Sequence, residues 1–198
     1  MKKTRKIRRN TTAAEMIPIR MIISIGIIAG ISVILAFAYA NMSITHAEHQ
    51  IKNDISELQS QLYLMRESGT PRDVDEIDAA EGTKRVQTFH LTESTNYLAF
   101  GVDPDKDNTG ILSTGLDEDG AVITYKVSKS SKNLIWLQKD KTRFVEGIYN
   151  TTTNSWDINT PYQGFILNSP GEATLCFELV QQHNQIYILI QATDSYEP

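Results

Sequence analysis

The sequence predicts an α+β protein in which a long N-terminal helix, first transmembrane and then amphipathic, packs on a mostly antiparallel β domain. Three observations lead to this fold class. Residues 21–40 form a run of 20 residues without a charge. Apolar residues then recur at helical spacing as far as Met65. From residue 85 onward, short segments rich in β-branched and aromatic residues alternate with turn signals.

The charge of the chain is unevenly divided. Residues 1–20 contain seven basic side chains and one acidic one, a net charge of +6, whereas the other 178 residues carry 12 basic and 23 acidic ones, a net charge of −11. Because an apolar segment follows the basic residues directly, we expect them to lie at a membrane surface and not on nucleic acid. The single cysteine, Cys176, does not indicate a redox compartment.

Residues 15–40 are expected to form a transmembrane helix behind a basic cytoplasmic leader, residues 1–14. Twenty helical residues span about 30 Å, the thickness of the hydrocarbon core of a bilayer. The preceding cations predict a single-pass protein of the cell membrane, with a cytoplasmic N-terminus and an extracellular C-terminal domain. A cleavable signal peptide is the alternative, because Ala38 and Ala40 match a small-residue cleavage pattern.

Residues 41–68 are expected to continue the helix as an amphipathic stalk. Its apolar stripe consists of Ile44, Ala47, Ile51, Ile55, Leu58, Leu62 and Met65. Such a stripe must lie on another surface, either the protein's own β domain or a neighbouring copy. Gly69 is expected to end the helix as a left-handed cap, and Pro71 follows it. Residues 69–84 then read as an acidic linker.

Residues 85–198 are expected to form the exported β domain, with about seven or eight strands. The candidate segments are residues 85–92, 96–102, 120–127, 133–139, 142–149, 164–169, 173–180 and 185–192. The sequence contains none of the common nucleotide-binding, nucleophile or zinc-protease motifs. We therefore expect that the protein is not an enzyme.

A basic leader, a glutamate, a long apolar helix that continues as an amphipathic one, and a small β domain together resemble type IV pilins and pseudopilins. The stretch EMIPIRMIISIGIIAGI is similar to the start of archaeal pilin-like membrane proteins. The resemblance implies a lollipop architecture and a non-enzymatic subunit of a cell-surface type IV pilus-like filament or assembly. Its partners would be membrane lipid and, through the N-terminal helix, other pilin-like subunits or further copies. The alternative is a single-pass, membrane-anchored extracellular binding module that does not polymerise.

Three candidate assembly residues lie at the start of the apolar helix: Glu15, Pro18 and Arg20. The resemblance implies that the carboxylate pairs with a cation of a neighbouring subunit, which a low-dielectric site would favour. The alternative is that Glu15 only caps the helix start. Whether the leader is cleaved also stays open, because Asn10 would precede the cut if Glu15 were the fifth residue. Further along the helix, four small residues would allow close packing against another helix: Gly26, Ala29, Gly30 and Ala36.

Two further sites come from local patterns. Carboxylates alternate in the stretch DPDKDNTG, as they do at the start of calcium loops: Asp103, Asp105 and Asp107. Asn108 suits the left-handed turn position, but Thr114 stands where an EF-hand needs glutamate, so the alternatives are a non-standard Ca2+ site and a plain acidic turn. We expect no other cofactor. Asn150 begins an N-glycosylation sequon in an exported loop.

Overall fold

The computed structural model describes residues 12–117, 120–128, 130–137 and 142–193, with side chains from Ile19 onward. Within these ranges the chain forms one helix and ten strands. It divides into two compact units, one ending at Ser43 and the other beginning at Ile44. The expected α+β fold class is therefore confirmed: one long N-terminal helix contacts a β domain whose strands pair mostly antiparallel.

Helix α1 (Thr12–Ser68) is continuous over 57 residues, so the expected divisions after residues 14 and 40 fall inside it. Pro18 lies inside α1, beyond its first turn. The end of α1 differs from the expectation for Gly69. The φ angle of Gly69 is not positive, and the residue is small for another reason: a Cβ atom there would collide with the Met65 carbonyl oxygen. That carbonyl accepts the Gly69 N–H at 2.8 Å.

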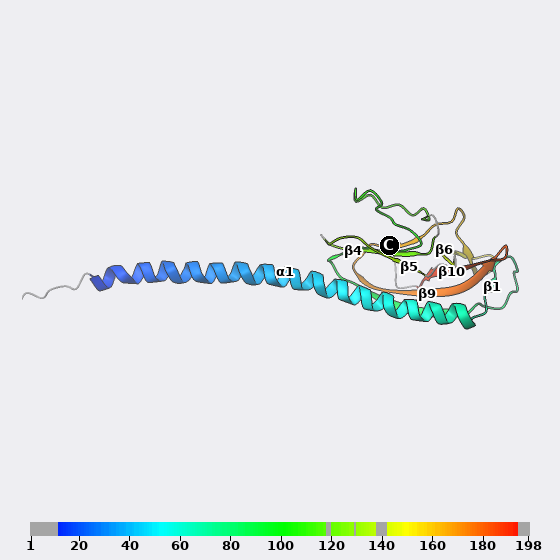
Figure 1. Cartoon of the computed structure of the whole chain (residues 1–198), viewed down its shortest axis with the longest axis horizontal. Coiled ribbons are helices and arrows are strands. Elements are labelled where there is room, and N and C mark those ends of the chain that lie inside the picture. Colours follow the sequence, from blue (N-terminus) through cyan, green and yellow to red (C-terminus); the bar gives the residue numbers. More distant parts are fainter. Residues whose placement is uncertain (1–11, 118–119, 129, 138–141, 194–198) are drawn as a thin grey trace, which may run out of the picture. The chain divides into compact units, whose positions relative to one another are not determined.

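The strands of the second unit form two sheets (Figure 1). The larger has the order β1-β9-β10-β6-β7, and β2 pairs with β9 on the same side as β1. The smaller has the order β5-β4-β3-β8. The parallel pairs are β1–β9 and β10–β6. The strands are β1 (Arg72–Asp73), β2 (Lys84–Leu91), β3 (Thr95–Phe100), β4 (Val122–Val127), β5 (Asn133–Trp136), β6 (Arg143–Asn150), β7 (Ser155–Ile158), β8 (Phe165–Leu167), β9 (Gly171–Gln182) and β10 (Gln185–Ala192).

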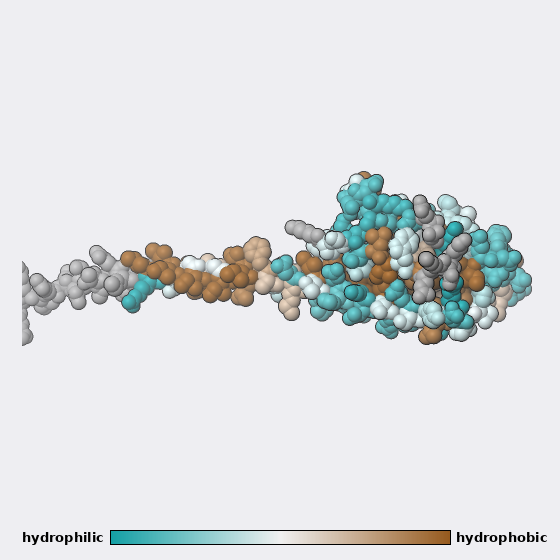
Figure 2. All heavy atoms as spheres, in the orientation of Figure 1, coloured by the Kyte–Doolittle hydropathy of each residue, from teal (hydrophilic) through white to brown (hydrophobic). Residues whose placement is uncertain are grey.

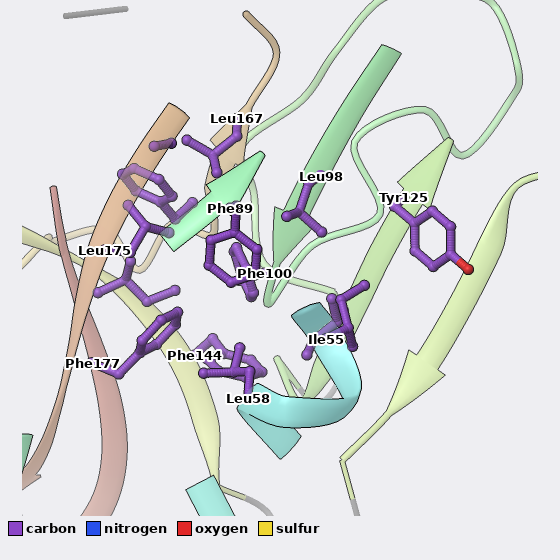
Figure 3. Packing of buried hydrophobic residues seen from close by; sticks show 14 of the residues in the cluster. Ile55, Leu58, Phe89, Leu98, Phe100, Tyr125, Phe144, Leu167, Leu175 and Phe177 are labelled. Atoms are coloured by element: carbon purple, nitrogen blue, oxygen red, sulfur yellow. The ribbon is translucent and has the colours of Figure 1, made fainter. Parts of the chain in front are cut away.

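The apolar stripe of the stalk lies in the core of the second unit. Of the two surfaces expected for it, the stripe therefore packs on the protein's own β domain. Ile55 and Leu58 are fully buried, and Figure 3 shows them against aromatic side chains from both sheets. Four phenylalanines pack edge to face or tilted at centroid distances of 5.6 to 6.4 Å: Phe89, Phe100, Phe144 and Phe177. Each buried Ile or Leu stabilises the fold by roughly 1.5–3 kcal/mol, so the stalk is part of the domain and not an appendage to it.

The expected acidic linker is held against the larger sheet. Arg72 donates to Glu178 on β9 at 2.9 and 3.1 Å and to the Trp156 carbonyl at 2.8 Å. Gly82 N–H and the Gln191 side chain also donate to the Glu178 carboxylate. Burial alone would raise the pKa of Glu178, but these donors outweigh it and the pKa is lowered. The linker is thus fixed at both ends by one buried carboxylate.

Candidate functional site

The apolar half of α1 is the first candidate site. Its side chains from Ile19 to Met42 are exposed, and Figure 2 shows brown, apolar residues along it. This part of the helix is long and apolar enough to cross a membrane. The hydroxyls of Ser24 and Ser32 are satisfied within the helix, since they donate to the carbonyls of Arg20 and Ile28 at 2.9 Å. A helix satisfies its interior backbone groups within itself, and one with an apolar surface all round suits hydrocarbon.

The residues expected to mediate helix packing fall into two groups. Ile51, Ile55, Leu58 and Leu62 are buried in the domain core, and Ile44 is partly buried there. The small residues Gly26, Ala29, Gly30 and Ala36 are exposed. A Cβ atom added at Gly26 or Gly30 would meet nothing within 4 Å, so both glycines leave room for a second helix.

The three candidate assembly residues lie at the start of α1. Glu15 and Pro18 are helical in backbone, but their side chains fall outside the described part of the chain. The Arg20 side chain is exposed at the edge of the apolar segment. The position of Arg20 suits a cation whose long stem reaches the lipid headgroups.

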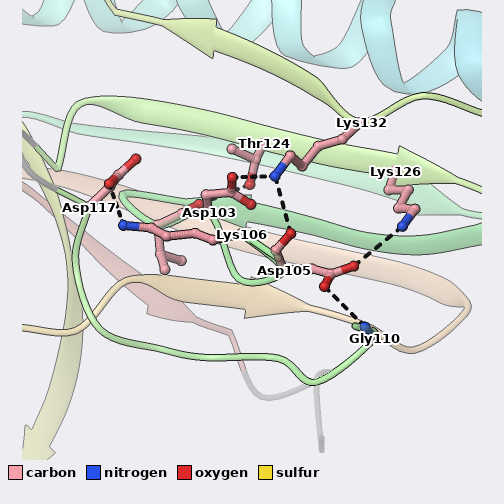
Figure 4. Close-up of polar contacts among 9 residues, drawn as sticks. Asp103, Asp105, Lys106, Gly110, Asp117, Thr124, Lys126 and Lys132 are labelled. Carbon is pink, nitrogen blue, oxygen red and sulfur yellow. Dashed lines mark hydrogen bonds and ion pairs between the residues drawn. The ribbon is translucent and has the colours of Figure 1, made fainter. Parts of the chain in front are cut away.

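A second candidate site lies at the stretch DPDKDNTG, where lysines accompany the carboxylates (Figure 4). Lys132 Nζ donates to Asp103 Oδ2 at 2.5 Å and to the Asp105 carbonyl at 3.1 Å. Lys126 Nζ lies 3.3 Å from Asp105 Oδ2, and the Gly110 N–H donates to Asp105 Oδ1 at 3.0 Å. Asp103 and Asp105 are almost completely buried, whereas Asp107 is exposed.

This arrangement does not support the calcium site. Among the described residues, no group of three or more His, Cys, Asp or Glu side chains is placed to hold a metal ion. The ammonium groups of Lys126, on β4, and Lys132, in the turn before β5, pair with the carboxylates that a metal ion would need. The Gly110 N–H and Lys126 hold the pKa of Asp105 below its usual range, so this carboxylate is ionised at neutral pH. Asn108 does adopt the left-handed conformation expected of it, with φ of 53°.

Sequence reasoning missed Tyr97, which lies next to this network. Tyr97 and Ala99 point to the outer face of the smaller sheet, whereas Leu98 and Phe100 point into the main core. Tyr97 is 1% exposed, and its hydroxyl has no hydrogen-bond partner in the structure; the same holds for Asp103 Oδ1. Burial and the nearby Asp103 and Asp105 carboxylates raise the pKa of Tyr97, so its hydroxyl stays protonated.

The candidate glycosylation residue Asn150 ends strand β6. Its Nδ2 donates to Asp157 at 2.9 Å, and its Oδ1 accepts the Thr152 N–H at 3.0 Å. The side chain therefore closes the turn between β6 and β7.

No protein family, curated protein or solved structure matches the chain in comparisons with known proteins.

Proposed function

We propose that this protein is a non-enzymatic, pilin-like or minor pseudopilin subunit that assembles at the cell surface through the apolar half of α1. Support for the proposal comes from one contrast within the helix. Its side chains from Ile19 to Met42 are exposed, whereas the stripe from Ala47 to Met65 is buried in the β domain. The buried stripe is already occupied, which leaves the apolar half for lipid and for neighbouring helices.

The proposed orientation places the N-terminus in the cytoplasm and the β domain outside the cell. It rests on the six cations among the first ten residues, which the positive-inside rule keeps on the cytoplasmic side. Protease added to intact cells should remove the β domain and leave an N-terminal tag protected. Digestion of the N-terminal tag from outside would contradict this topology.

Glu15 is the residue proposed to take part in assembly. A capping role needs only a hydrogen-bond acceptor, so Glu15→Gln would cost a few tenths of a kcal/mol. An assembly role needs the charge, because a partner cation left unpaired in a low-dielectric site costs on the order of a few kcal/mol. Glu15→Gln therefore separates the two roles.

The test is co-purification of tagged and untagged copies from native membranes. Glu57→Gln, the same chemical change at an exposed position of α1, is the matched control. We expect self-association in the wild type and in Glu57→Gln, and its loss in Glu15→Gln at normal expression. Equal self-association of all three forms would exclude the role of Glu15, and none in any form would exclude assembly of copies through the helix.

A second candidate function is a single-pass anchored module that binds a ligand with its β domain and does not polymerise. The observation that favours it is the buried hydroxyl of Tyr97, which has no partner although it lies next to charged side chains. Absence of self-association would leave this module as the better proposal.

A further inference from the structure

The outer face of the smaller sheet carries a polar pocket that the proposed assembly does not use. Its volume is about 210 Å3, and it is lined by Asn96, Tyr97, Asp105, Gly110, Leu112 and Lys126. Strands β3 and β4 supply its floor, and the segment that follows Val102 supplies its opposite wall. The Lys–Asp pairs described above hold that segment against the sheet, so the pocket is built by contacts distant in sequence.

Tyr97 is the feature of this pocket that calls for a ligand. Buried polar atoms in folded proteins almost always have hydrogen-bond partners, and each exception needs an explanation. The Tyr97 hydroxyl is buried without one, although the side chain lines a pocket with room to spare. A water molecule occupies about 30 Å3 in the liquid, so the pocket has room for about seven waters or for part of one sugar ring.

The lining groups define the chemistry of the ligand. Asp105 only accepts hydrogen bonds, Lys126 only donates them, and Asn96 and Tyr97 do both. Asp105 and Lys126 lie 3.3 Å apart and compensate each other's charge, so the pocket favours a neutral group. A hydroxyl can both donate to a carboxylate and accept from an ammonium or a phenol through a single oxygen atom.

We propose that this pocket binds the hydroxyl groups of a sugar, with one hydroxyl between the Tyr97 hydroxyl and the Asp105–Lys126 pair. Water offers the same chemistry, so ordered water is the alternative occupant that the test must distinguish. The proposal is independent of assembly through α1. Tyr97→Phe should leave self-association unchanged, and Glu15→Gln should leave sugar binding unchanged.

The test is saturation-transfer NMR on the full chain, held in a detergent whose headgroup is not a sugar. The probes are glucose, galactose, mannose and N-acetylglucosamine, and acetamide represents a primary amide. We expect at least one sugar to bind in the millimolar range. Tyr97→Phe removes only a hydroxyl that has no protein partner, so it should fold normally and weaken that sugar about fivefold, the usual worth of one neutral hydrogen bond.

Tyr125→Phe is the matched control, because Tyr125 is a buried tyrosine on the neighbouring strand β4 that packs in the main core. It should bind the sugar as the wild type does. Saturation transfer to none of the four sugars would overturn the proposal and leave a pocket for ordered water only. Transfer to acetamide alone, or sugar binding unchanged in Tyr97→Phe, would overturn it as well.

Discussion

The two halves of α1 have similar apolar residues and opposite surroundings. Ile34 in the first half is 68% exposed, whereas Ile55 in the second is fully buried. The first half is apolar on every side, and the second confines its apolar residues to one stripe. The comparison teaches that the distribution of apolar residues around a helix, more than their number, decides whether it lies in lipid or on a protein core.

The largest effect should come from a charge placed in the buried stripe. Leu58→Asp puts a carboxylate among buried aromatic side chains, and we expect it to lower the free energy of unfolding by at least about 4 kcal/mol. Leu64→Asp, at a position of α1 that is 58% exposed, should change it by less than about 0.5 kcal/mol. Denaturant unfolding followed by tryptophan fluorescence measures both. Equal losses in the two variants would mean that the stripe does not distinguish the two sides of the helix.

The next largest effect should come from the ion pair that joins the segment after α1 to strand β9. Arg72→Met leaves Glu178 buried without its main partner, and we expect a loss of about 3–5 kcal/mol at neutral pH. Arg85→Met, at a partly exposed position, should cost less than about 1 kcal/mol. Similar urea midpoints for Arg72→Met and the wild type would show that the ion pair is dispensable.

The same ion pair predicts a pH dependence. The pKa of Glu178 is lower in the folded state, so the unfolded state binds the proton more tightly. The stability that Glu178 contributes is therefore present above its unfolded pKa and lost as pH falls through the folded pKa. Arg72→Met should remove this acid sensitivity, and unfolding midpoints between about pH 6 and pH 3 test it.

Removing side-chain volume should have a smaller effect than adding charge. Ile55→Ala opens a cavity in the core and should cost about 2–4 kcal/mol. Ile34→Ala makes the same change in the apolar half and should leave unfolding of the β domain unchanged. A comparable loss from Ile34→Ala would mean that the apolar half contributes to the stability of the domain.

The smallest effect should come from Asp54, on the half-buried flank of the stalk. Burial raises its pKa, and its Oδ2 has no hydrogen-bond partner in the structure. The stability linked to its proton is present below the unfolded pKa and lost as pH rises through the folded pKa. Asp54→Asn should thus stabilise the protein at neutral pH, by less than about 1 kcal/mol because solvent screens the group. Destabilisation by this variant would show that the carboxylate has a partner that matters.

Periodicity predicted most of the fold, and it failed where elements are too short to show a period. The stripe from Ile44 to Met65 and eight strands follow from spacing and composition. Strand β1 has two residues, both polar, and β7 has four residues that alternate polar and apolar over only two repeats. Strand β1 forms because it pairs with β9, and β7 forms because it pairs with β6. A local sequence pattern does not show which strands will pair.

For the candidate sites, too, the sequence shows local patterns but not contacts between distant residues. The sequence marks Asp103, Asp105 and the turn at Asn108, but it does not show that Lys126 and Lys132, more than 20 residues away, reach the two carboxylates. It also treats Tyr97 as one more strand residue. The pocket beside Tyr97 exists because a distant loop covers the outer face of the sheet, and such long-range packing decides what a local acidic pattern does.

The burial of the stalk has a mechanical consequence. The helical residues from Ile44 to Ser68 belong to the same compact unit as the β strands, so a force applied to the start of this stalk acts on the interior of the domain. The load then acts as shear along the buried stripe, where several apolar contacts resist together and not one after another. A pull on the start of the stalk would therefore strain the interior of the domain directly, and traction at that point would register as a change in the core.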